Sequence, residues 1–176
     1  AQREYNEAEK KRALEKSIRE KAAVLRRECP DVCTGKTDEY LANNEYSVRS
    51  EQRKYNERKE EAKKILSSYH DGATAVCGYI STWSISESNI KKLIENKTKI
   101  QAEQRKIEAN KAELAKISPQ LSEVKKKYPL AVKEIVKEHK WSLSRAEDAK
   151  ALLLLIDSFS SRQEVEEDKI ISNKVR

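Results

Sequence analysis

Apolar residues near the start of the chain recur at the spacing of a helix. The positions concerned are Leu14, Ile18, Ala22, Leu25 and Cys29. Steps of three and four residues place side chains on one stripe of a helix surface. Pro30 ends this pattern, and the segment that follows it carries the Asp and Gly typical of a reversal. The pattern therefore predicts a first helix over residues 3–29.

The next stretch carries a repeat in which apolar residues fall seven positions apart. Its members are Leu41, Val48, Tyr55, Ala62, Tyr69, Val76, Trp83 and Ile90. A constant interval of seven keeps one seam turned toward a partner helix, as in a coiled coil. Thr37 or Asp38 can cap the start. Asp71-Gly72 interrupts or kinks the helix, so we expect helices over residues 38–70 and 73–83.

A second seven-residue stripe begins at Leu93 and has a partner row between its members. The two rows comprise Leu93, Ile100, Ile107, Leu114, Leu121, Tyr128 and Ile135, with Ile117, Val124 and Ala131 between them. Ser84 and Glu87 fit a capping box, and Ser118-Pro119 fits a helix restart. These signals predict helices over residues 86–117 and 119–141. Asn110 falls in the partner row, where a polar residue either fixes coiled-coil register or faces water at a bundle edge.

The last predicted helix covers residues 145–172, with Ser144 and Glu147 as a second capping box. It contains five consecutive large apolar residues, Leu152, Leu153, Leu154, Leu155 and Ile156. Such a run points in every direction around a helix, so it must be covered on several sides. The cover is either another subunit or an intrachain core with Trp141, Phe159 and Trp83. The whole pattern predicts one elongated all-α domain, a helical bundle or antiparallel coiled coil.

Composition supports a few long helices over a wide globular core. Only 37% of the 176 residues are hydrophobic and 38% are charged, against about 45–50% and about 25% in typical domains. Three Gly and three Pro leave few sites for tight turns. The net charge of +7 is spread over short clusters such as Lys10-Lys11-Arg12 and Lys125-Lys126-Lys127. Solvated helix faces are the expected role, and binding to nucleic acid or an anionic surface is the alternative.

Three cysteines allow one intrachain disulfide and leave one thiol over. Cys29 and Cys33 lie four positions apart across the predicted turn, so we expect them to staple it in an oxidising compartment. Cys77 lies beyond reach of the pair along an unbroken helix. We expect it to be a buried thiol or a bridge between subunits, unless a bend at Asp71-Gly72 folds it back.

The sequence offers no recognisable catalytic or cofactor chemistry. Its two histidines, His70 and His139, accompany no paired-cysteine or metalloprotease spacing, and its three glycines are isolated from one another. Glu134, Glu138 and His139 share a helical neighbourhood, which is the usual composition of a surface ion-pair cluster. We therefore expect no enzyme activity, no cofactor and no metal.

These patterns favour a structural or interaction protein that assembles through long amphipathic helices, with itself or within a larger assembly. A secretion, viral or surface assembly is the expected setting. The sequence contains no run of about 18 apolar residues, so it predicts no transmembrane segment. The chain begins at Ala1 and contains no Met, which slightly favours export over a cytoplasmic location.

Overall fold

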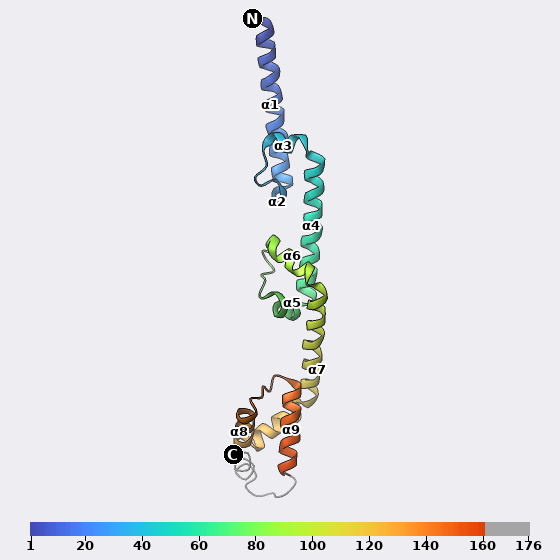
Figure 1. Ribbon diagram of the computed structural model, residues 1–176, viewed down its shortest axis with the longest axis vertical. Helices are drawn as coiled ribbons and strands as arrows, with labels where there is room; N and C mark the ends of the chain where they lie inside the picture. The colour runs from blue at the N-terminus through green and yellow to red at the C-terminus, as the bar shows by residue number, and fades with distance from the viewer. Residues whose placement is uncertain (161–176) are drawn as a thin grey trace. The chain divides into compact units, whose positions relative to one another are not determined.

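The computed structural model describes residues 1–160, which form an all-α fold, as the sequence predicted (Figure 1). The chain divides into two compact units, Ala1–Lys97 and Thr98–Arg176. The first unit contains α1 (Gln2–Glu28), α2 (Pro30–Cys33), α3 (Asp38–Asn43), α4 (Glu45–Ser68), α5 (His70–Cys77) and α6 (Glu87–Glu95). The later helices are α7 (Lys97–Lys127), α8 (Pro129–His139) and α9 (Ala146–Ser160). The part of the last predicted helix beyond residue 160 lies outside the described residues.

Two asparagines divide helices that the sequence predicted to be continuous. Asn44 separates α3 from α4, and Asn96 separates α6 from α7. In both cases the side-chain amide donates to the carbonyl four residues earlier, of Tyr40 and Lys92 respectively, at 2.8 Å. Asparagine competes with the helix ladder through such local bonds, which allows the backbone to leave helical geometry. The spacing of apolar residues contains no sign of this effect. The predicted helices 38–70 and 86–117 are therefore each interrupted, at Asn44 and Asn96.

Helix caps and prolines also differ in part from the expected signals. Thr37 caps α3 by accepting from the Tyr40 amide at 3.2 Å, as predicted. Ser86, and not Ser84, caps α6, because its hydroxyl accepts from the Asn89 amide. The break before Pro129 is present, but α7 continues through Pro119. A proline within a helix removes one backbone hydrogen bond, so the helix on both sides of it must offset that loss.

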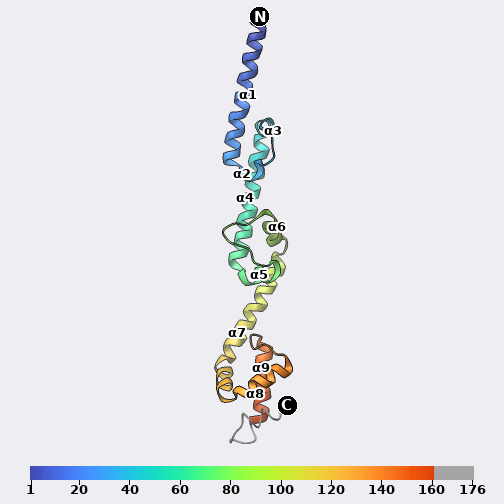
Figure 2. The same cartoon turned by 90° about the vertical axis from the view of Figure 1, so that its left-hand side faces the viewer.

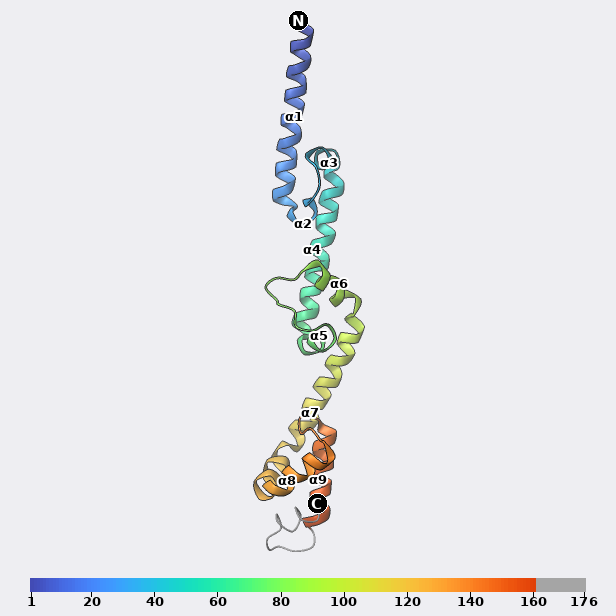
Figure 3. The same cartoon turned by 60° about the vertical axis from the view of Figure 1, so that its left-hand side comes forward.

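The first two long helices do not form the expected antiparallel pair. Figure 1 and Figure 3 show α1 and α4 running in the same direction. After α2, residues 34–37 lead back along α1, and α3 packs against α1 before α4 begins. The small core enclosed there consists of Ala22, Leu25, Cys29, Cys33, Leu41 and Val48. Each long helix therefore contributes only a short buried stretch to this core.

The seven-residue repeat is divided among separate contacts instead of lining one seam. Leu41 and Val48 enter the core around α1, whereas Ala62 and Ile90 are buried where α4 packs against α6. Trp83, a member of the same repeat, is 97% exposed. Figure 2 shows the loop between α5 and α6 that carries it. Within helices the members of the repeat are buried or, like Tyr55 and Val76, partly buried, whereas Trp83 in the loop is exposed.

The second unit encloses its own core between α7, α8 and α9. Its buried members are Leu121, Tyr128, Ala131, Val132, Ile135, Ala149, Leu152 and Ile156. Leu121, Tyr128, Ala131 and Ile135 belong to the predicted rows of the middle helices, and Leu152 and Ile156 to the predicted apolar run, whereas Val132 and Ala149 were not predicted.

Candidate interaction surfaces

The first part of α1 forms an arm, defined here as residues 1–17, in which every residue is exposed. Its apolar stripe continues from the buried Ala22 and Leu25 to Ile18, which is half-buried, and Leu14, which is 61% exposed. The cover provided by α3 therefore ends before the stripe does. The arm's polar contacts include the bond from the Tyr5 hydroxyl to Glu9 at 3.0 Å, which lies within the same helix.

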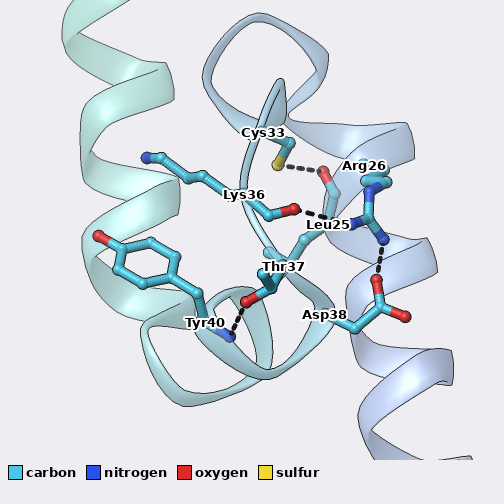
Figure 4. A network of polar contacts seen from close by, with 7 residues as sticks. All are labelled: Leu25, Arg26, Cys33, Lys36, Thr37, Asp38 and Tyr40. Carbon is cyan, nitrogen blue, oxygen red and sulfur yellow. Dashed lines mark hydrogen bonds and ion pairs between the residues drawn. The ribbon is translucent and has the colours of Figure 1, made fainter.

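A polar network fixes the reversal that follows α1 (Figure 4). Arg26 pairs with Asp38 and also donates to the Lys36 carbonyl oxygen at 3.0 Å. Lys36 in turn reaches Glu51 on α4 at 2.8 Å, and this bond raises the pKa of the lysine. One arginine therefore joins α1 to the returning segment and to α3. The network holds the base of the arm at a defined place in the unit.

Two further contacts tie α2 to α4. The Gln52 side chain accepts from the Asp31 amide at 3.2 Å and donates to the Asp31 carboxylate at 2.7 Å. Gln52 is the buried polar residue among the described positions, and these bonds satisfy both ends of its amide. The reversal is thus secured by polar bonds in addition to its small apolar core.

The three cysteines are free thiols in this structure. Cys29 and Cys33 are both buried in the same core, and the Cys33 thiol donates to the Leu25 carbonyl oxygen at 3.5 Å. Burial, and secondarily the neighbouring Cys33, raises the pKa of Cys29. A disulfide between Cys29 and Cys33 remains a prediction. Cys77 is half-buried at the end of α5, where burial also raises its pKa.

The predicted belt Leu152–Ile156 is largely an internal feature of the second unit. Leu152 and Ile156 are fully buried, and Leu153 and Leu155 pack partly against the same core. Trp141 and Phe159 contribute to that core, as the intrachain alternative supposed, but Trp83 does not. Leu154 alone of the five is exposed, at 72%. The run of leucines is therefore explained mostly by folding of the chain itself.

Asn110 has a role that neither sequence hypothesis named. Its side-chain oxygen accepts from the Ala146 amide at 2.8 Å, at the first residue of α9, and its amide donates to the Ser144 carbonyl oxygen at 2.9 Å. The free amides at a helix start need an external acceptor. Asn110 supplies one from α7, so it fixes where α9 begins. A single sequence contains no signal for a cap that comes from a distant helix.

A charged contact supports the same junction between α7 and α9. Glu113 bonds to Lys150 on α9 and to Lys116 on its own helix. These two lysines, Lys150 first, lower the pKa of Glu113 to about 2. The carboxylate is therefore ionised throughout the physiological range.

The basic clusters named in the sequence lie on exposed helix surfaces. Lys10-Lys11-Arg12 belongs to the arm, and Lys125-Lys126-Lys127 closes α7. Basic residues in the last turn of a helix also interact favourably with its dipole, which accounts for the second cluster locally. Binding of nucleic acid or an anionic surface stays a prediction. Within residues 1–160, no helix is long and apolar enough to cross a membrane, and no group of three His, Cys, Asp or Glu is placed to hold a metal ion.

Comparisons with protein-family models, curated proteins and solved structures find no match for this chain.

Proposed function

We propose that this protein is a non-enzymatic interaction protein that assembles through its helices, with the arm of α1 as the contact surface. The observation that carries the proposal is the apolar stripe of α1, which is covered at Ala22 and Leu25 and uncovered at Leu14. A stripe that runs past the end of its intrachain cover is suited to receive a helix from a second copy.

The helical state of the arm also favours a partner. Packing of an amphipathic face supplies most of the stability of helices in proteins. The arm has no tertiary packing in the described unit, since all its residues are exposed. Contact with another helix would supply what the single chain does not.

The expected association is weak and concentration-dependent. In a dimer each copy buries Leu14 and Ile18, so four side chains contribute at most about 1.5–3 kcal/mol each, and Ile18 contributes less because it is already half-buried. Association costs about 4–15 kcal/mol in lost freedom, so these four side chains alone do little more than offset it. Further contacts along the arm are needed, so we expect assembly to build up as the protein is concentrated.

The test combines light scattering with circular dichroism of the full chain over a range of concentrations. The proposal predicts that mass and helix content rise together, because pairing folds the arm. Leu14→Ser with Ile18→Ser should abolish the rise in helix content and lower the mass reached at each concentration. Tyr5→Ser is the matched control, since it removes a large exposed side chain from the same arm away from the stripe. A chain that remains monomeric, with constant helix content, would rule the proposal out.

A further inference from the structure

The loop between α5 and α6, residues 78–86, presents two aromatic rings to solvent. Trp83 is 97% exposed and Tyr79 is 80% exposed. Ile80 and Ile85, in the same loop, are buried at 3% and 5% exposure. The loop is thus anchored to the first unit by its isoleucines, while its largest side chains face outward.

Local bonds fix the backbone that carries these rings. Gly78 ends α5 with φ of 79°, and its amide donates to the Thr74 carbonyl oxygen at 3.0 Å. A residue with a side chain rarely adopts this left-handed geometry. The Trp83 amide donates to the Ser81 hydroxyl at 3.3 Å. The exposed indole therefore projects from a held segment, which lowers the ordering cost of any contact it makes.

A hollow lies beside the same loop, against the last turns of α4. Its volume is about 350 Å³, and Thr82 and Ile85 of the loop line it together with Leu66 of α4. Volumes of about 300–1,000 Å³ accept ligands or inserted side chains. Trp83 lies between Thr82 and Ile85 in the sequence, so the exposed ring belongs to the same loop segment that lines the hollow.

The charges around the hollow are of both signs. Glu60, Lys63 and Lys64 all line it. Glu60 and Lys63 are paired within α4 at 3.2 Å. In a twofold contact the same surface of both copies meets. A residue that contacts a second residue of the partner is then matched by the same contact with the two copies exchanged. Glu60 and Lys64 lie one helical turn apart on α4, so a twofold rotation that opposes the two α4 helices can place Glu60 of each copy opposite Lys64 of the other.

We propose that this surface is a twofold interface between two copies of the chain, in which Trp83 of each copy enters the hollow of the other. Tyr79 packs at the edge of the contact, and Glu60 of each copy pairs with Lys64 of its partner. Trp and Tyr burying about 150–250 Å² each are the residues that most often dominate interface energetics. This interface is separate from the arm of α1 and does not depend on it.

The first experiment uses Trp83 as its own reporter. In a Trp141→Phe chain, Trp83 is the single tryptophan. Its emission should shift to shorter wavelength, and its quenching by iodide should fall, as the concentration and the mass rise. Trp83→Ser should raise the dissociation constant of the dimer about thirtyfold or more, as hot-spot truncations do. Tyr46→Ser, which alters an exposed tyrosine on α4, should leave it unchanged.

The second experiment tests the pairing of charges. Glu60→Lys alone and Lys64→Glu alone should each weaken the dimer, because like charges then meet at both symmetric contacts. An equimolar mixture of these two variants should form a mixed dimer, since opposite charges meet again. Circular dichroism of each variant checks that α4 remains helical.

Two results would overturn the inference. One is a Trp83 emission that stays fully exposed at every concentration. The other is a dimer that Trp83→Ser leaves intact. A dimer that depends on Leu14 and Ile18 but not on Trp83 retains the proposed function and removes this interface. A dimer that depends on Trp83 alone does the reverse.

Discussion

Replacement of Asn110 by Ala should destabilise the second unit, because it removes the cap of α9. Loss of a side-chain cap costs about 0.5–2 kcal/mol, and loss of the bond to the Ser144 carbonyl adds about 0.5–1.5 kcal/mol. The expected loss is therefore about 1–3.5 kcal/mol. Thermal unfolding followed by the fluorescence of Trp141, in a Trp83→Phe chain, reports this unit. The midpoint should fall by at least about 4 °C.

Two further variants at Asn110 separate the cap from other roles. Asn110→Asp keeps an acceptor at the start of α9, where negative charge is favourable, so it should lose less stability than Asn110→Ala. Asn110→Leu should destabilise the unit as well. A polar residue that only fixed coiled-coil register would behave in the opposite way, since its replacement by Leu stabilises an apolar seam. A more stable Asn110→Leu protein would refute the capping role.

Leu152→Ala should cost about 2–5 kcal/mol, because it opens a cavity in the core, whereas Leu154→Ala at an exposed position should change the unfolding free energy by less than about 0.5 kcal/mol; equal losses would contradict the assigned burial. The lowered pKa of Glu113 stabilises the fold above about pH 4.5, and this contribution disappears as the pH falls toward 2. Glu113→Gln should therefore remove that part of the acid dependence, measured by unfolding at successive pH values. Mild oxidation should form a disulfide between Cys29 and Cys33 within one chain. Peptide mapping that instead finds both thiols free would refute the predicted disulfide.

The sequence predicted the helical class and most buried positions because apolar periodicity records which side of a helix is covered. Leu25, Leu41 and Ile135 all lie on predicted stripes, and all are buried. The pattern could not show that α1 and α4 run in the same direction, since periodicity contains no information about whether two helices pack parallel or antiparallel. It also could not locate the two units, which depend on which stripes meet.

The remaining differences arise from polar side chains that act over short or long range. The local bond of Asn44 to the Tyr40 carbonyl breaks a helix without changing the apolar pattern. Asn110 acts on Ala146 from another helix, which no local signal records. Trp83 was assigned to a seam because it keeps the seven-residue interval. The Gly, Ser and Thr residues around it, which are typical of loops, were the available sign that the helix had ended.

The mass of the full chain in solution tests the central claim, assembly through helical surfaces, most directly. Light scattering over increasing concentration, with and without reductant, should show a mass that rises above that of one 176-residue chain in both conditions, because the proposed contacts are non-covalent. An increase that appears only without reductant would assign assembly to an intermolecular disulfide. A mass that remains that of a single chain at every concentration would contradict the account.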